Sequence, residues 1–470
     1  MRTNLVVVVF AMLLCATYAH AAELRESSDI YGPFGTLHLY QTSDNPGHLV
    51  LFLSGDGGWN LGVVDMARSL ATLDSMVVGI DINHYIGRLN AAHGTCSYAA
   101  AHLESLSQYL QKKYRFRHYV PPVLVGYSSG ATMVYATLAQ SPANTFAGGI
   151  SLAFCPDLKT IKPFCRGSGN MGKRPDPKLG FIYTAVESLP SPWMVLQGEI
   201  DQVCSPPDTK QFVARVGNSE LIALPKVGHG FSVQRNWMPQ FRDAFQRIVD
   251  RQKADAKAAP AIRDAAVNDL PLVVLPIDGQ SDSLAVIVSG DGGWASLDKQ
   301  IGDALNRHGI PVIGLNSLQY FWEKKTPDMA GRDLARILSH YSRVWSIRHF
   351  ILVGYSRGAD TLPFMVSRLP DALKSKVSSV ALLGMGEHVD FEFHVEDWLS
   401  SDTEGQHDVV PEVQKLKGMN VVCIYGRDES HSACNKLDAA SARSIEMPGG
   451  HHFAGNYENL ASIVLEQGKH

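Results

Sequence analysis

An internal duplication is the feature of this sequence that most restricts its fold. The hexapeptide Ser-Gly-Asp-Gly-Gly-Trp at 54–59 recurs unchanged at 289–294, which is too long a match for chance. A repeat at this distance along the chain is the size of a whole domain, so the sequence predicts two tandem domains of one fold and not a solenoid. Two later motifs recur in the same order, Gly-Tyr-Ser-X-Gly at 126–130 and 354–358, and Gly-His-X-Phe at 228–231 and 450–453.

The boundaries of the two domains follow from the repeats and from local composition. We expect an N-terminal domain over residues 22–250 and a C-terminal domain over residues 269–470. Between them, residues 251–268 are rich in Ala, Lys and Asp and include Pro260. This segment has no apolar face to bury, which is typical of a linker or a solvated helix end.

Residues 1–21 have the pattern of a cleavable export signal. Positive charge at Arg2 precedes an apolar run at 5–14, and small residues at 19 and 21 suit a cleavage site. A membrane anchor is the alternative, but the apolar run is well short of the roughly 20 residues that a spanning helix needs. We therefore predict cleavage before Ala22 and export to the periplasm.

Short apolar runs alternate with helical patterns in each copy. That alternation predicts an α/β fold, with two tandem α/β-hydrolase domains in which helices flank a mostly parallel sheet. Predicted helices include 99–112 and 331–341. The predicted strands are 49–53, 76–80, 123–125, 149–152 and 194–197 in the first copy, and 285–288, 312–315, 350–353, 380–383 and 421–425 in the second.

The glycine-flanked serines Ser128 and Ser356 each follow a predicted buried strand and precede a helix-compatible run. This context is typical of a nucleophile elbow, in which a tight turn exposes the serine hydroxyl. Such a serine needs a histidine base and an orienting acid, which in this fold follow it in the order serine, acid, histidine. In the first copy, Asp201 and His229 follow Ser128 in that order.

The second copy offers two candidates for the acid. Counting from the preceding glycine aligns Glu429 with Asp201, whereas Asp428 is the commoner residue type in triads of this kind. The alignment favours Glu429 and leaves Asp428 as the alternative, and it selects His451 over His452 as the base. A metal site at the two adjacent histidines is disfavoured because no third ligand stands at zinc-like spacing. We expect neither a metal nor a cofactor.

The repeated hexapeptide follows an early strand, where this fold supplies a backbone donor to the oxyanion hole. Glycines let backbone N–H groups approach developing negative charge. A tight turn without a catalytic role is the alternative, although retention of the motif in both copies disfavours it. We expect the donors to come from Asp56 or Gly57 together with Ser129, and from Asp291 or Gly292 together with Arg357.

Of the seven cysteines, one falls in the predicted signal and six remain. An even number permits disulfides in an exported chain. The close pairs Cys155/Cys165 and Cys423/Cys434 are the natural candidates. A buried free thiol is an equal alternative for Cys423, because it lies in the apolar run 421–424.

Taken together, the motifs resemble those of the VirJ/AcvB family of bacterial virulence proteins. The resemblance spans nearly the whole mature chain in a tandem form, and shorter family members resemble the second half alone. It implies a periplasmic hydrolase that cleaves the aminoacyl ester of lysyl-phosphatidylglycerol, using Ser356, an acid at 428 or 429, and His451. The supporting motifs are the two Gly-Tyr-Ser-X-Gly elbows, the repeated hexapeptide, Tyr-Phe-Trp at 320–322, Lys-Lys-Thr-Pro at 324–327, and Gly-Gly-His-His-Phe at 449–453.

Acidic and aromatic residues follow the strand that ends near Leu383. Insertions at this point commonly cover the active site of such hydrolases, so the acids could hold an ammonium group beside an apolar patch that touches lipid. A solvated acidic face explains the same pattern equally well. The acids are Glu387, Asp390, Glu392, Glu396 and Asp397, and the aromatics are Phe391, Phe393 and Trp398.

The partner expected from the resemblance is an aminoacylated phospholipid at the membrane surface. Nucleic acid is excluded as a partner, because the formal net charge is -4 and no basic run is interleaved with aromatics. Two rival functions stay open, an exported esterase of other specificity and a non-catalytic partner of a secretion machine. Triad candidates in both copies also leave open whether the first site turns over or only binds.

Overall fold

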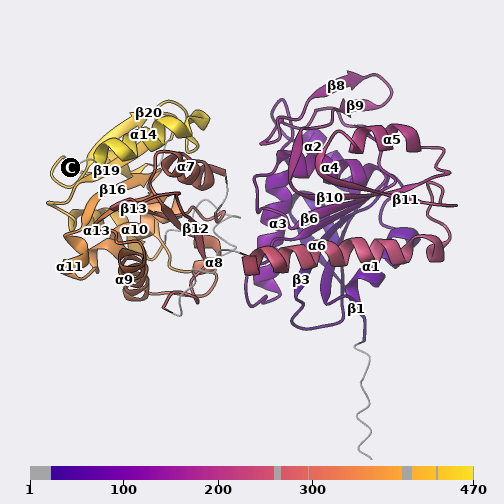
Figure 1. Ribbon diagram of the computed structural model, residues 1–470. Coiled ribbons are helices and arrows are strands. Elements are labelled where there is room, and N and C mark those ends of the chain that lie inside the picture. The colour runs from indigo at the N-terminus through magenta and orange to yellow at the C-terminus, as the bar shows by residue number, and fades with distance from the viewer. Residues whose placement is uncertain (1–22, 259–265, 295, 394–404, 430–431, 469–470) are drawn as a thin grey trace, which may run out of the picture.

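The structure is a computed structural model that describes residues 23–258, 266–294, 296–393, 405–429 and 432–468. The chain forms two lobes, and each is built around one large sheet (Figure 1). The predicted export signal at 1–21 lies outside the described residues. Among the helices that the structure describes, none is both long and apolar enough to cross a membrane.

The first lobe contains an eight-stranded sheet. An antiparallel hairpin of β1 and β2 forms one edge, and all strands beyond β2 run parallel to one another. A small antiparallel sheet of β7 (Asp157–Leu158), β9 (Gly180–Tyr183) and β8 (Lys173–Asp176) follows strand β6 along the chain. The order of the large sheet is β1 (Arg25–Tyr31), β2 (Gly35–Gln41), β4 (Ser75–Ile80), β3 (His48–Leu53), β5 (Val123–Tyr127), β6 (Gly148–Leu152), β10 (Ser188–Gly198) and β11 (Gly217–Leu224).

The second lobe repeats this sheet from β2 onward with seven strands. Its first strand is antiparallel to its neighbour and the rest are parallel. The predicted fold of two tandem α/β-hydrolase domains is therefore confirmed. The order is β12 (Leu272–Leu275), β14 (Val312–Leu315), β13 (Ser283–Val288), β15 (His349–Tyr355), β16 (Val377–Leu383), β19 (Val421–Gly426) and β20 (Arg443–Met447), with a separate pair of β17 (His388–Val389) and β18 (His407–Asp408).

Both faces of each sheet are covered by helices, which explains why the strands are continuous apolar runs. In β3, Leu51 faces the core beneath α3 (Ala99–Lys113) and α4 (Ser129–Gln140), whereas Phe52 faces α1 (Leu61–Ala71) and α6 (Met238–Ala258). Figure 1 shows α6 lying across the sheet of the first lobe. The remaining helices are α2 (Ile82–Ala91), α5 (Pro206–Val213), α7 (Ser296–Arg307), α8 (Ser317–Tyr320), α9 (Pro327–Val344), α10 (Arg357–Ser367), α11 (Asp371–Lys374), α13 (Val409–Gln414) and α14 (Tyr457–Gln467).

The predicted elements agree with the observed ones. Every predicted strand lies within an observed strand, and the predicted helices 99–112 and 331–341 lie within α3 and α9. The first part of the segment predicted as a linker or helix end, 251–258, continues helix α6.

The disulfides correct one prediction and confirm another. Cys155 does not pair with Cys165, because Cys155 follows β6 and meets Cys204 beyond the end of the adjacent strand β10. Cys165 pairs with Cys96, since their neighbours Phe164 and Ser97 form a parallel bridge. Proximity in sequence was therefore the wrong criterion for Cys155. The Cys423–Cys434 pair is present as predicted, so the free-thiol alternative for Cys423 is wrong.

Trp322 joins the two lobes. Its indole N–H donates to Phe116 O at 3.0 Å, and its ring packs against Tyr119 of the first lobe and Phe393 of the second. Lys112 of α3 donates to Trp322 O at 2.7 Å. Because Trp322 is almost completely buried, this contact fixes part of the second lobe against α3.

The tryptophan of the repeated hexapeptide has the same structural role in both lobes. The ring of Trp59 lies over Gly79 of β4, where a Cβ would be 2.1 Å from Trp59 Cζ2. Trp294 covers Gly314 of β14 in the same way, at 2.2 Å. Each loop after the first parallel strand is therefore anchored by an aromatic ring that needs a glycine beneath it.

We expect Gly79→Ala to lower the free energy of unfolding by about 1–3 kcal/mol, because the added methyl displaces the Trp59 ring. Gly87→Ala is the matched control. Gly87 lies inside α2, and a Cβ added there would have no atom within 4 Å, so this change should preserve or raise stability. Urea unfolding followed by tryptophan fluorescence measures both, and equal stability of the two variants would contradict the anchoring role.

Candidate active sites

The first serine sits in a turn that only glycine neighbours permit. Ser128 has φ 54° and ψ -119° between β5 and α4. A Cβ at Gly126 would lie 2.1 Å from Gly130 O, and a Cβ at Gly130 would lie 2.3 Å from Leu53 O. The Gly-X-Ser-X-Gly pattern is therefore a steric requirement of this strained turn.

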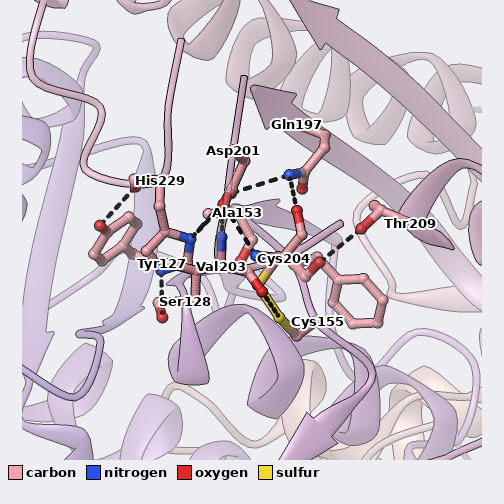
Figure 2. A network of polar contacts seen from close by, with 11 residues as sticks. Tyr127, Ser128, Ala153, Cys155, Gln197, Asp201, Val203, Cys204, Thr209 and His229 are labelled. Carbon is pink, nitrogen blue, oxygen red and sulfur yellow. Dashed lines mark hydrogen bonds and ion pairs between the residues drawn. A yellow bond between two sulfur atoms is a disulfide. The ribbon is translucent and has the colours of Figure 1, made fainter. Parts of the chain in front are cut away.

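The predicted first triad is assembled in the structure. Ser128 Oγ lies 3.0 Å from His229 Nε2, and His229 Nδ1 lies 3.0 Å from Asp201 Oδ2 (Figure 2). This arrangement lets the imidazole accept the serine proton at one nitrogen while the carboxylate stabilises the charge at the other. Tyr127 also donates its hydroxyl hydrogen to His229 O at 2.8 Å, which holds the histidine loop against the elbow.

The acid of the first triad is buried and well oriented. Asp201 Oδ1 accepts from the backbone N–H groups of Val203 and Cys204 at 2.8 and 3.0 Å, and Oδ2 accepts from Gln197 Nε2 at 3.1 Å. Figure 2 shows the Cys155–Cys204 disulfide beside this carboxylate. The disulfide ties the Asp201 loop to the chain that follows strand β6.

Asp201, Cys204 and His229 also form a group close enough to hold a metal ion, with potential ligand atoms within 4.8 Å of one another. Cys204 Sγ is bonded to Cys155, however, and is therefore no thiolate ligand. Asp201 and His229 are already hydrogen bonded to each other. The group therefore fits a serine triad better than a metal centre.

The second elbow has the same geometry as the first. Ser356 has φ 52° and ψ -123° between β15 and α10. A Cβ at Gly354 would lie 2.4 Å from Gly358 O, and a Cβ at Gly358 would lie 2.0 Å from Val288 O. The backbone that presents the serine is thus duplicated along with the sequence motif.

Glu429, and not Asp428, contacts the histidine of the second copy. His451 Nδ1 lies 2.5 Å from Glu429 Oε1. Asp428 is exposed, and its N–H donates to Gly449 O. His452 instead lies beside Tyr355, with its Nδ1 3.1 Å from the tyrosine hydroxyl.

Ser356 and His451 are not hydrogen bonded to each other in the described part of the chain. The His451 ring lies against Gly384, where a Cβ would be 2.8 Å from Cε1. The residue at this position in the first lobe is Ala153, since Leu152 and Leu383 pair equivalently with the two elbows. His451 therefore uses space that a methyl group fills in the first lobe, and it must shift to reach Ser356.

The loops expected to supply oxyanion donors lie directly against the two serines. A Cβ at Gly55 would be 3.1 Å from Ser128 Cβ, and one at Gly290 would be 3.5 Å from Ser356 Cβ. The predicted donors follow these glycines directly in the sequence. They are Asp56 and Gly57 in the first lobe, and Asp291 and Gly292 in the second. Ser129 and Arg357 are the first residues of α4 and α10, so their N–H groups belong to the first helical turn beside the serines. The Asp56 carboxylate accepts from Ser129 Oγ at 2.5 Å.

The Ser356 site opens into a cavity of about 570 Å³ between the lobes. Carboxyl groups line it from both sides, with Glu104 of α3 facing Asp291 and Asp298 of the second lobe. Burial raises the pKa of Glu104 to about 8, and the charge of Asp291 adds to the effect. Asp298 is buried, its Oδ1 has no hydrogen-bond partner among the described residues, and burial raises its pKa well above the ordinary value.

Two of the acids around Ser356 were missed by the motif analysis. Asp298 takes the place of Val63, and Asp360 takes the place of Thr132, when the two copies are aligned on their shared motifs. The signal that could have found them was present, because each is a carboxyl group in one copy and an uncharged residue in the other. Glu104 could not be found in this way, since it comes from the other lobe.

The aromatic residues after Leu383 that the structure describes do not form the exposed, lipid-facing patch that the sequence suggested. Phe391 and Phe393 are buried, so they add nothing to an exposed apolar surface. Glu392 pairs with Lys112 of the first lobe at 3.2 Å, and Glu387 pairs with Lys436 at 2.5 Å. Asp390 accepts from the N–H of Gln406, and Glu396, Asp397 and Trp398 lie outside the described residues.

The strained serine turns, the order of serine, acid and histidine, and the parallel sheets define both lobes as α/β-hydrolase domains. The sequence profile of the bacterial virulence protein VirJ matches residues 47–148 and 282–470. The chain belongs to the VirJ family. The two matched segments fall in different lobes, as expected for a tandem arrangement.

Solved structures similar to this chain include several hydrolases. A putative dienelactone hydrolase from Klebsiella pneumoniae is 13% identical with a TM-score of 0.36, and the match covers 49% of this chain and 99% of the other. Est1E from Butyrivibrio proteoclasticus is 12% identical with a TM-score of 0.31, covering 49% and 99%. A thermophilic esterase from Thermogutta terrifontis is 13% identical with a TM-score of 0.34, covering 48% and 94%. No match was found among curated protein sequences.

The hydrogen bond to Glu429 raises the pKa of His451, and partial burial opposes this effect. We therefore expect Glu429→Gln to lower the pKa of His451, because a neutral amide no longer stabilises the imidazolium. Asp428→Asn is the matched control and should leave that pKa close to its original value. NMR titration of the His451 imidazole measures both. A larger decrease in the Asp428 variant would reverse the assignment of the acid.

Proposed function

We propose that this chain is an exported serine hydrolase that cleaves the aminoacyl ester of aminoacylated phosphatidylglycerol, lysyl-phosphatidylglycerol among its substrates. The observation that carries the proposal is the pair of serine, histidine and acid sites in a member of the VirJ family. The carboxyl groups around Ser356 support a cationic acyl group as the substrate of the second site. Burial disfavours ionisation of these carboxyl groups, and a bound cation would offset that effect, so the cavity suits a positively charged ligand.

The proposed reaction has two acyl-transfer steps. His451 accepts the Ser356 proton as Oγ attacks the ester carbonyl, and backbone N–H groups stabilise the oxyanion. The bond to the glycerol oxygen then breaks, and the imidazolium returns a proton to that oxygen, which releases phosphatidylglycerol. Water, deprotonated by His451, next attacks the acyl-serine. The bond between the acyl carbon and Ser356 Oγ breaks, the imidazolium returns its proton to Oγ, and the amino acid leaves. The steps balance without a redox partner.

The proposed location is the periplasm, at the membrane surface. Three disulfides support an oxidising compartment outside the cytoplasm. The substrate ester lies in a phospholipid headgroup, so the protein meets it at the lipid interface. Removal of aminoacyl groups there would change the surface charge of the membrane, which links the activity to lipid homeostasis and virulence.

The first lobe supports a second candidate function, hydrolysis of an ester with an uncharged acyl group. Ser128, His229 and Asp201 are already hydrogen bonded. The positions equivalent to Asp298 and Asp360 hold Val63 and Thr132. A neutral environment at these two positions suits a substrate that brings no positive charge.

Amino-acid release from lysyl-phosphatidylglycerol in liposomes tests the proposal, with wild type, Ser128→Ala, Ser356→Ala and the double variant. We expect Ser356→Ala to reduce release by on the order of 10³-fold or more, because no other group replaces the nucleophile. Ser128→Ala should change it by less than about twofold. If wild type cleaves water-soluble esters but no aminoacyl lipid, the proposed substrate is wrong. If the double variant keeps full activity, the serine mechanism is wrong.

The rate at the second site should fall as the pH decreases through the pKa of His451, because only the neutral imidazole accepts a proton. The bond to Glu429 raises that pKa above its ordinary value of 6.5. The midpoint of the acid limb of kcat/KM should therefore lie above pH 6.5. Measurement in the Ser128→Ala background isolates the second site. A rate that is constant from about pH 5 to 8 would contradict His451 as the base.

A further inference from the structure

Asp360 lies one helical turn beyond the second nucleophile. Its N–H donates to Ser356 O at 3.0 Å, which closes the first turn of α10. Its carboxylate contacts Gly386, two residues after Gly384, against which the His451 ring lies. The charge of Asp360 also acts on His451, so this carboxylate belongs to the surroundings of the second site.

The Asp360 carboxylate is held by one of its two oxygens. Oδ1 accepts from the N–H of Gly386 at 2.7 Å, in the chain that follows strand β16. Oδ2 accepts no hydrogen bond in the part of the chain that the structure describes, and the side chain is partly exposed. The neighbouring cation Arg357 extends away to the carbonyl oxygens of Asp390 and Glu392. One carboxylate oxygen is therefore available to a ligand.

The first lobe shows that the fold does not need an acid at this position. Its equivalent, Thr132, donates its hydroxyl hydrogen to Cys155 O at 2.7 Å. Both side chains therefore tie the first turn of the helix to the chain after the neighbouring strand, at equivalent residues Cys155 and Gly386. Thr132 makes this contact with an uncharged side chain. Holding the helix in place therefore does not require the charge of Asp360.

The chemistry of an aminoacyl ester supplies an explanation for this charge. Its α-ammonium nitrogen is two bonds from the carbonyl carbon that the serine attacks, whichever amino acid is attached. An anionic group that recognises this ammonium must therefore lie within a few ångströms of the nucleophile. We propose that Asp360 is the specificity residue that binds the α-ammonium group of the aminoacyl ester at the second site. This inference rests on the proposed function.

The electrostatic surroundings of Asp360 agree with a cationic ligand. Burial raises the pKa of Asp360 to about 7; the N–H of Gly386, Arg357 and His451 oppose this effect, and Asp291 adds to it. The free site therefore holds this carboxyl partly protonated at neutral pH. A bound ammonium group would favour the ionised form and would form a charge-assisted hydrogen bond with it.

Alanyl-phosphatidylglycerol and N-acetylalanyl-phosphatidylglycerol provide the test. The first carries a charged α-ammonium group, and the acetyl group of the second converts this group into a neutral amide. Both are offered in vesicles to the Ser128→Ala protein with and without Asp360→Asn. The asparagine keeps an oxygen that can accept from Gly386. We expect Asp360→Asn to reduce kcat/KM for the alanyl lipid by about 10- to 100-fold, as for loss of a charged hydrogen bond. Hydrolysis of the N-acetylalanyl lipid should change by less than about threefold.

Three further variants complete the experiment. Asp360→Thr copies the first lobe and should give the same change in selectivity, whereas Asp360→Glu should restore part of the preference for the alanyl lipid. Asp371→Asn removes an exposed charge from α11, which precedes β16 at the end of that strand opposite to Leu383 and the active site, and it should leave both rates unchanged. Thermal unfolding of each variant identifies any loss of folded protein.

Each outcome decides the assignment. An equal decrease in kcat/KM for both lipids would overturn the assignment. Asp360 would then act by changing the pKa of His451, and the acid limb of the pH profile would shift. Unchanged rates on both lipids would also overturn it. If the parent cleaves the N-acetylalanyl lipid but no aminoacyl lipid, the proposed function fails and the Asp360 assignment fails with it. If the parent cleaves both and Asp360→Asn keeps the same ratio, only the Asp360 assignment is wrong.

Discussion

The tight turn that carries each serine is the constraint on which the rest of each lobe depends. At Gly130 and Gly358 the helix begins so close to the end of the adjacent strand that any Cβ would collide with a backbone carbonyl. The loop that carries the repeated hexapeptide also lies beside the serine. The unusual backbone of Ser128 and Ser356 costs about 1–3 kcal/mol each, and the burial of the flanking strand and helix offsets it. One steric contact therefore sets the positions of nucleophile, sheet and loop together.

Duplication kept this backbone and allowed the side chains around it to change in a coordinated way. The second lobe replaces the aspartate of the first triad by Glu429, which is longer by one methylene. It also replaces Ala153 by Gly384, which removes the methyl group that would collide with the His451 ring. Each of these changes alone would disturb the histidine. Together they let a longer acid reach the same imidazole nitrogen at 2.5 Å.

The sequence was sufficient to predict the α/β fold and the strands, because these depend on local patterns. It also singled out the residues that meet as Ser128, His229 and Asp201, and as His451 and Glu429, from their order along the chain. Counting from a shared glycine was enough to prefer Glu429 over Asp428. The Cys155–Cys204 bridge was not predictable, since it depends on β6 and β10 being neighbours in space. Glu104 was equally out of reach, because its position near Ser356 depends on how two lobes with separate cores meet.

The acids around Ser356 would be a disadvantage in an esterase of general specificity. Ionised carboxyl groups near the nucleophile would disfavour the oxyanion that forms in the transition state, and the charges of Asp291 and Asp360 raise the pKa of the histidine that must be neutral. A substrate with a positive charge next to its carbonyl reverses the first effect, because the ammonium compensates the carboxylates and stabilises the oxyanion. It also reverses the second, because the same charge lowers the pKa of His451. Under the proposed function, the cationic acyl group of the substrate therefore offsets the unfavourable effects of these acids.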